Sequence, residues 1–62
     1  MYAKVVTKSD PLMIRNSANR SSKIIGKIPK GSKAEVIKKD STWTKVKYKS
    51  VTGYSATRYL KF

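Results

Sequence analysis

The sequence predicts an all-β domain, folded as a small barrel of about five short strands. Over no ten-residue stretch do apolar residues recur with the spacing of an amphipathic helix. Short apolar runs instead alternate with turn signals rich in Gly, Pro, Asp, Asn and Ser. The chain has 62 residues and no cysteine or histidine, so no disulfide or thiolate metal site can support it. A closed or nearly closed sheet is the economical way to give such a chain an apolar core.

The region from Leu12 to Gly26 is expected to organise the domain. Leu12 and Ile14 share one side of an extended chain, because side chains alternate along a strand. Residues 16–22 lack apolar periodicity and are rich in Ser and Asn, which favour turns. The sequence therefore predicts a polar loop held between two strands, a common way to present a recognition surface.

Each expected strand is an apolar-rich run between two turn signals. Asp10-Pro11 ends the first run, because proline lacks a backbone N–H and biases the preceding residue to extended geometry. Gly26 lies inside a run and indicates a bulge or sharp bend. A turn is expected at Ile28–Gly31, with Pro29 in its second position and Gly31 in its fourth. The expected strands cover residues 3–7, 12–15, 24–29, 32–39, 42–49 and 51–56, and residues 57–62 then make one tight helical turn and pair along a sheet edge.

The charge is strongly unbalanced. Fifteen Lys and Arg residues face three acids, which gives a formal net charge of +12. Such a charge favours anionic partners, among them nucleic acid, anionic lipid and anionic wall polymers. The basic residues are spread along the chain, which indicates a charged face on a folded unit. No segment approaches the ~20 apolar residues needed to span a bilayer, and the first residues lack the apolar stretch of a signal peptide.

Catalysis is not expected of this chain. It has no His or Cys, and its only carboxylates are Asp10, Glu35 and Asp40, too few for a convincing acid–base pair. Asp10 and Asp40 both fall in predicted turns, where Asp serves the backbone. The sequence therefore predicts a monomeric binding protein that uses neither a metal nor another cofactor.

Trp43 is the first candidate ligand contact. It shares one side of the strand at 42–49 with Lys45, whereas Val46 and Tyr48 lie on the other side. An exposed indole beside Lys45 would be a platform for a sugar face or a peptide. The alternative is that a bulge turns the indole inward, or that it covers the open end of the barrel.

The other candidate contacts also have ordinary structural roles open to them. The planar guanidinium of Arg15 could clamp a carboxylate, but tying down carbonyls of the polar loop is the favoured role. Asn16 and Asn19 could contact a ligand or simply form turns. Tyr54 and Tyr59 lie near the end of the sheet and beside the closing turn, where either could instead pack in the core with its hydroxyl in solvent.

The ordered set of motifs resembles the bacterial Src-homology-3 (SH3b) domain family. Each motif is weak alone, but together they run in order over nearly the whole chain. The resemblance implies an SH3-like barrel of five to seven short strands, a single domain over residues 1–62 and one module of a longer protein. The matching pieces are Leu12-Met13-Ile14-Arg15, Ser21-Ser22-Lys23-Ile24-Ile25-Gly26, Lys30-Gly31, Val36, Trp43, Lys45-Val46-Lys47-Tyr48, Gly53-Tyr54 and Tyr59-Leu60.

The chain departs from the family pattern in four places. Ser17-Ala18 replaces a Gly-Pro in the loop, so that loop is expected to differ in shape. Lys49-Ser50 replaces the usual Asn-Gly hairpin, which loses the residues best suited to positive φ. Ser55 replaces the Val that follows the aromatic residue, and Met13 stands where Asn is common.

The resemblance also implies a function. It points to a non-catalytic module, outside the cell or at the wall, that targets a covalently attached hydrolase to peptidoglycan or an associated anionic wall polymer. The ligand would lie in a groove between residues 16–22, Trp43 and Tyr54 or Tyr59. A basic small barrel that binds nucleic acid is the alternative, supported by the charge but not by any recognisable RNA motif. A binder of proline-rich peptides has little support, because such grooves usually have acidic loops and acids are scarce here.

Overall fold

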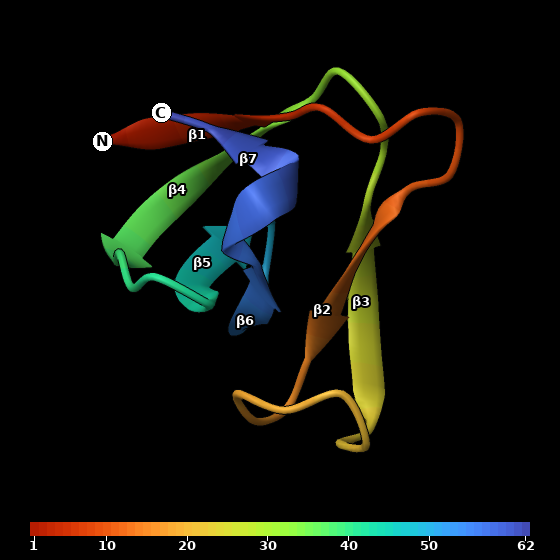
Figure 1. Ribbon diagram of the computed structural model, residues 1–62, viewed down its shortest axis with the longest axis vertical. Helices are drawn as coiled ribbons and strands as arrows, with labels where there is room; N and C mark the ends of the chain where they lie inside the picture. The colour runs from red at the N-terminus through yellow and green to blue at the C-terminus, as the bar shows by residue number, and fades with distance from the viewer.

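The computed structural model describes residues 1–62 and is all-β, with one 3-10 turn near the C-terminus (Figure 1). The predicted fold class is therefore confirmed. No helix in the structure is long and apolar enough to span a bilayer. The elements are β1 (Tyr2–Val5), β2 (Leu12–Arg15), β3 (Ile24–Ile28), β4 (Lys33–Lys38), β5 (Trp43–Tyr48), β6 (Val51–Ala56), the 3-10 helix η1 (Thr57–Tyr59) and β7 (Leu60–Lys61).

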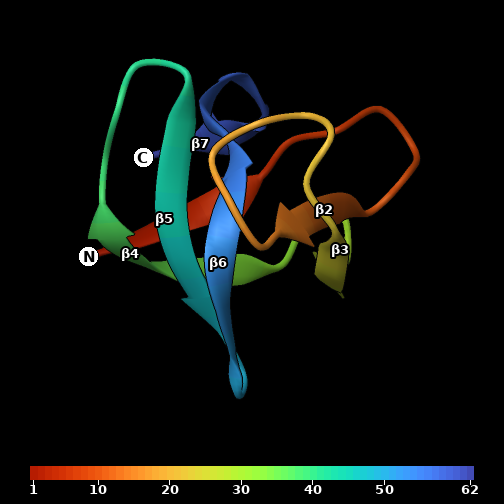
Figure 2. The same ribbon diagram turned by 90° about the horizontal axis from the view of Figure 1, so that it is seen from below.

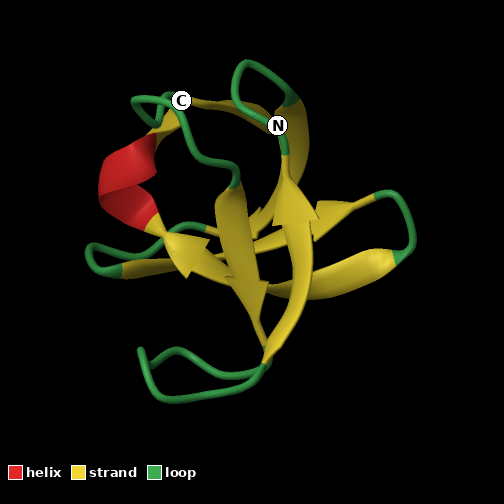
Figure 3. Ribbon diagram, turned by 90° about the vertical axis from the view of Figure 1, so that its right-hand side faces the viewer, coloured by secondary structure: helices red, strands yellow, loops and turns green.

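All seven strands belong to one antiparallel sheet in the order β3-β2-β6-β5-β4-β1-β7. The sheet curls on itself, so that the molecule measures 24 × 23 × 23 Å (Figure 3). The β5–β6 hairpin lies near the middle of the order and pairs along its whole length, from Trp43↔Ala56 to Tyr48↔Val51. As predicted, the C-terminal segment pairs along an edge, where β7 adds to β1.

The core consists of side chains that alternate with exposed ones along the strands. Eight hydrophobic residues are buried, and Ile14, Ile28 and Val46 are completely so. In β5 the predicted alternation is confirmed, since Thr44 and Val46 point inward and Tyr48 packs partly buried against the core. The buried hydrophobic residues are Ala3, Val5, Leu12, Ile14, Ile28, Ala34, Val46 and Leu60.

β2 crosses β6 at very close range, and Gly53 makes this possible. A Cβ at Gly53 would lie 2.5 Å from the Arg15 carbonyl oxygen and 2.6 Å from Cγ2 of Ile14. The two strands are paired at only one position, Arg15↔Tyr54. Beside it the buried Ser55 hydroxyl donates to the Met13 carbonyl at 3.0 Å. Ser55, where the resembling family has Val, thus adds a hydrogen bond where the ladder stops.

The turn after β3 differs from its prediction, and the bulge near Gly26 is confirmed. The turn expected at 28–31 lies one residue later, because the Ser32 N–H donates to the Pro29 carbonyl at 3.0 Å. Gly31 is therefore in its third position, where its φ of +87° suits a type II turn. The bulge expected near Gly26 is present, since Ile14 pairs with Gly26 but Arg15 pairs with Ile24.

Strand ends also shift by one or two residues from those predicted. β1 starts at Tyr2 and ends at Val5 rather than covering 3–7. The Val6 N–H nevertheless donates to the Tyr59 carbonyl at 2.8 Å, which ties the start of the β1–β2 connection to η1. In the β5–β6 hairpin, Lys49 adopts the positive φ of 56° that Asn or Gly more often supplies.

Candidate ligand-binding groove

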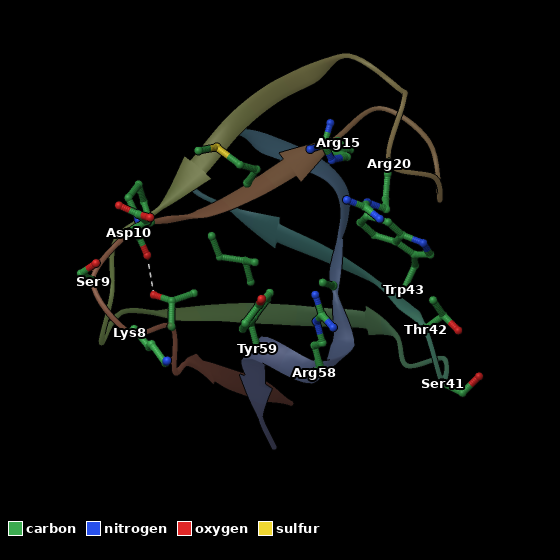
Figure 4. Close-up of a pocket in the computed structure, with 15 residues that line it drawn as sticks. Lys8, Ser9, Asp10, Arg15, Arg20, Ser41, Thr42, Trp43, Arg58 and Tyr59 are labelled. Atoms are coloured by element: carbon green, nitrogen blue, oxygen red, sulfur yellow. Dashed lines mark hydrogen bonds between the residues drawn. The ribbon is translucent and has the colours of Figure 1, made fainter.

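A groove of about 900 Å³ lies between the β1–β2 connection on one side and η1 with the β4–β5 loop on the other (Figure 4). Residues of β2 and the last residue of β6 complete its lining. The lining residues are Thr7, Lys8, Ser9, Asp10, Pro11, Leu12, Met13, Arg15, Arg20, Ser41, Thr42, Trp43, Ala56, Arg58 and Tyr59.

Two aromatic rings line this groove. Trp43 is the first residue of β5 and is only half-buried, because it points away from the side that carries Thr44 and Val46. The indole is therefore not among the buried core residues, so no bulge turns it inward, which was one of the two alternatives considered for it. Tyr59 ends η1 and is 36% exposed. The groove thus offers two partly exposed rings that a flat sugar face or an apolar peptide side chain could contact.

Hydrogen bonds through Thr57 fix these two rings relative to each other. The Thr57 N–H donates to the Thr42 carbonyl at 3.0 Å, and its hydroxyl donates to the Asp40 carbonyl at 2.7 Å. That hydroxyl oxygen also lies 2.8 Å from the buried Thr44 hydroxyl, which can donate to it. The start of η1 is therefore fastened to the loop that leads into Trp43.

Three guanidinium groups gather at the end of the groove that holds Trp43 (Figure 4). Arg15 donates to the Ser22 carbonyl at 3.0 Å, so the structural role favoured for it is present. A guanidinium carries five N–H groups, so Arg15 keeps donors for a ligand. Arg58 lies 5.0 Å from the centroid of the Tyr59 ring, and Arg20 reaches in from the polar loop. This end of the groove is suited to carboxylates, which the planar guanidinium fork binds with two parallel hydrogen bonds.

The opposite end of the groove is formed by the β1–β2 connection and carries Lys8 and Asp10 (Figure 4). The Thr7 hydroxyl donates to the Asp10 carbonyl and closes this segment into a turn. The Lys30 ammonium donates to the Lys8 carbonyl from the β3–β4 turn. With four cationic side chains and one carboxylate along its lining, the groove favours anionic ligands.

The polar loop at 16–22 is held together by its own side chains. The Ser22 hydroxyl lies within hydrogen-bond distance of the Ser17 and Asn19 carbonyls, at 3.0 and 2.9 Å. The side-chain oxygen of Asn19 accepts hydrogen bonds from the N–H and hydroxyl of Ser21, both at 3.1 Å. The Asn16 N–H donates to the Lys23 carbonyl at 2.9 Å and closes the base of the loop. Asn19 is thus a turn former here, and the bonded loop presents Arg20 to the groove.

The structure brings only part of the predicted site together. Arg15, Trp43 and Tyr59 line the groove, whereas Asn16, Asn19, Lys45 and Tyr54 do not. Lys45 and Tyr54 lie opposite each other on β5 and β6, on the outer face beside the groove.

Sequence reasoning missed Arg20, Arg58 and Asp10 as lining residues. Arg58 could have been found, since it is next to Tyr59 in the sequence. The other residues could not, because no local pattern relates residues 7–13 to residues 41–43. No group of three or more His, Cys, Asp or Glu side chains is placed to hold a metal ion.

Comparisons with known proteins agree with the fold. Residues 10–61 match the model of the bacterial SH3 domain family. A protein of Bacillus subtilis (strain 168) named "Putative N-acetylmuramoyl-L-alanine amidase YrvJ" is 46% identical over 56 residues, which is 89% of this chain. The chain spans only 11% of that relative's length. The solved structure of NlpC2 from Trichomonas vaginalis contains the same fold, with a TM-score of 0.88 at 21% identity. The match covers the whole of this chain and 23% of the NlpC2 chain.

Proposed function

Because the chain belongs to the bacterial SH3 domain family, we propose that it is a non-catalytic cell-wall-binding module that holds an attached hydrolase on peptidoglycan. The name of the Bacillus subtilis relative is that of an amidase, and the matched segment is a small part of its length. On this proposal, residues 1–62 form one domain of a longer protein that acts at the wall. The chemistry belongs to the attached domain, and this chain supplies the attachment.

The observation that carries the proposal is the composition of the groove. Trp43 and Tyr59 provide ring faces, and the half-buried Met13 adds apolar surface. Three guanidinium groups stand at one end. Peptidoglycan combines sugar rings with short peptides that carry carboxylates, so both kinds of surface have a partner in one polymer.

The predicted site residues take different places in this proposal. Trp43 and Tyr59 contact the flat or apolar parts of the ligand, and Arg15 binds a carboxylate from a position that Ser22 fixes. Lys45 and Tyr54 lie beside the groove on the outer face of the sheet, outside the peptidoglycan contact. Asn16 and Asn19 act through the shape of the loop that carries Arg20.

Retention on purified peptidoglycan tests the proposal. At physiological salt the wild-type domain is expected to sediment with the polymer, and Trp43→Ala is expected to weaken binding about tenfold or more, as for a central aromatic contact. Tyr2→Ala is the matched control, since Tyr2 is an exposed aromatic that does not line the groove. Failure of the wild-type domain to bind, with or without teichoic acid present, would end the proposal. Equal retention of Trp43→Ala and Tyr2→Ala would exclude this groove.

A nucleic-acid-binding barrel is the second candidate, because the charge of +12 suits any polyanion. Salt dependence alone does not separate the two candidates, since both ligands are anionic. Competition does so: a muropeptide is expected to displace the domain from peptidoglycan, whereas an oligonucleotide at the same concentration is not. Displacement by the oligonucleotide alone would favour the second candidate.

A further inference from the structure

A row of three cationic side chains and one tyrosine crosses the outer face of the sheet beside the groove. The register pairs Lys38 of β4 with Lys45 of β5, just past a bulge between Val36 and Lys38, and it pairs Lys45 with Tyr54 of β6 and Tyr54 with Arg15 of β2. Residues directly opposite each other in a sheet point to the same face, with Cβ atoms about 5 Å apart. We call Lys38, Lys45, Tyr54 and Arg15 the cationic row. Its two middle residues, Lys45 and Tyr54, belong to β5 and β6, which lie side by side in Figure 2.

The cationic row adjoins the groove but is largely separate from it. Trp43 and Ala56 are the next outward-facing pair along β5 and β6, and both line the groove. Two residues along a strand cover about 6.7 Å, so the row begins one such step from the indole. Of its four members only Arg15 also lines the groove. A long polymer could therefore lie on both surfaces at once.

The rest of this face is also cationic. Lys4 of β1 lies between Lys61 of β7 and Lys33 of β4, which makes a second row of three directly paired lysines. Between the two rows stands Glu35, the one acid among these strands, paired with Lys47. The other acids of the chain, Asp10 and Asp40, lie in loops. Most of the positive charge on this face is thus without a carboxylate opposite it.

Lysines directly opposite each other destabilise a sheet, because their charges repel at short range. The pairs Lys4–Lys33 and Lys4–Lys61 are of this kind, and Lys38 faces Lys45 beside the bulge in β4. A ligand with regularly repeated negative charges would relieve that repulsion where it lies along a row. Strands lie about 4.8 Å apart, so the three intervals from Lys38 to Arg15 cover about 14 Å. This length suits several successive charges of a linear polymer rather than one isolated ion.

We propose that the cationic row binds a phosphodiester polymer of the cell wall, of the poly(alditol phosphate) type. This inference rests on the proposed function, because a wall-bound domain meets that polymer where it is joined to peptidoglycan. The groove then takes the peptidoglycan and the row takes the phosphates beside it. Single-stranded nucleic acid suits the row less well, since it binds by stacking successive bases on aromatic side chains and the row has only Tyr54.

The test compares Lys38→Gln/Lys45→Gln with a variant of equal charge, Lys23→Gln/Lys27→Gln. All four lysines have at least part of their side chain in solvent, and neither Lys23 nor Lys27 pairs with a residue of the row. The probe is purified poly(glycerol phosphate) at low salt. The row variant is expected to lose about tenfold or more in affinity and to reduce the slope of log K against log salt by one to two. The control variant is expected to change little.

A second ligand separates this inference from the proposed function. Peptidoglycan stripped of phosphate polymer is expected to bind wild type and Lys38→Gln/Lys45→Gln equally, because the groove is intact in both. If the stripped polymer is not bound by the wild type, the proposed function fails and the poly(glycerol phosphate) result stands alone. Equal affinity of the two charge variants for poly(glycerol phosphate) would overturn the row as a site. Tighter, row-dependent binding of an oligonucleotide of equal charge would overturn the assignment to a wall polymer.

Discussion

At the scale of single residues, Arg15 serves the fold and the groove together. Its backbone carbonyl lies against Gly53, its side chain holds the Ser22 carbonyl, and its guanidinium lines the groove. Because one N–H is bonded within the protein, the planar group loses much of the rotational freedom that a free arginine would have to give up on binding. The residue that ends β2 therefore presents a preoriented cation.

Of the three glycines, Gly53 is the one with the least room for a side chain. In Gly53→Ala the new methyl group would meet the Arg15 carbonyl oxygen and Ile14 within 2.6 Å, so β2 must move away from β6. We expect a loss of about 1–3 kcal/mol in the free energy of unfolding, the usual cost of overpacking. Urea denaturation measures it, with Thr52→Ala at the exposed neighbouring position as the control. A variant as stable as the control would contradict the close crossing of β2 and β6.

The residue roles that could be predicted from the sequence are those that depend on neighbours along the chain. Alternation alone gives Trp43 an outward and Val46 an inward orientation, and both are confirmed. The need for glycine at position 53 depends on Arg15 and Ile14, which are distant in sequence, so no local pattern reveals it. The same reason hides Arg20, whose place in the groove depends on how the polar loop folds back.

At the scale of elements, the groove exists because η1 is fastened to the β4–β5 loop. Thr57 makes that connection with its N–H and its hydroxyl, yet Thr57 itself does not line the groove. η1 is a single turn with no buried residue of its own. Packing therefore contributes little to its position, and the hydrogen bonds of Thr57 set where Arg58 and Tyr59 stand relative to Trp43.

Thr57→Val is expected to loosen the groove without touching its lining. The change keeps the shape of the side chain but removes the hydroxyl that bonds to Asp40 and Thr44, and it leaves the buried Thr44 hydroxyl without a partner. We expect a loss of about 1–3 kcal/mol in unfolding free energy and weaker binding to peptidoglycan. Denaturation and sedimentation measure the two effects, with Thr52→Val in β6 as the control. Unchanged binding would mean that η1 is positioned in another way.

Strands could be predicted where the alternation of apolar residues and the turn-forming residues agree. The residues at which strands begin and end were harder to predict. β2 and β6 have the predicted bounds, and the helical turn before the last strand is present. The turn after β3 was predicted one residue early, because the sequence pattern alone does not say which residue takes the positive φ. The groove joins the β1–β2 connection to η1, and this depends on how the sheet closes rather than on any single element.

At the scale of the whole molecule, the dominant feature is a charge of +12 within 24 × 23 × 23 Å. At 10 mM salt the screening length is about 30 Å, longer than the molecule, so every cation repels every other. At 150 mM it is about 8 Å, and only neighbours such as Lys38 and Lys45 still interact strongly. Because an unfolded chain spreads the same charges farther apart, repulsion at low salt acts mainly against the folded state.

The thermal stability of the domain is therefore expected to rise with salt. Between 10 and 200 mM NaCl we expect Tm to increase by several degrees, since about 1 kcal/mol corresponds to 4–8 °C in a domain of this size. Lys38→Gln/Lys45→Gln removes a directly opposed pair and should show a higher Tm at low salt and a smaller rise. Sodium chloride is the appropriate salt, because sulfate would also strengthen apolar burial. A Tm that stays constant or falls would show that the cations lie too far apart to act on the fold, and the repulsion assigned to the paired lysines would then be negligible.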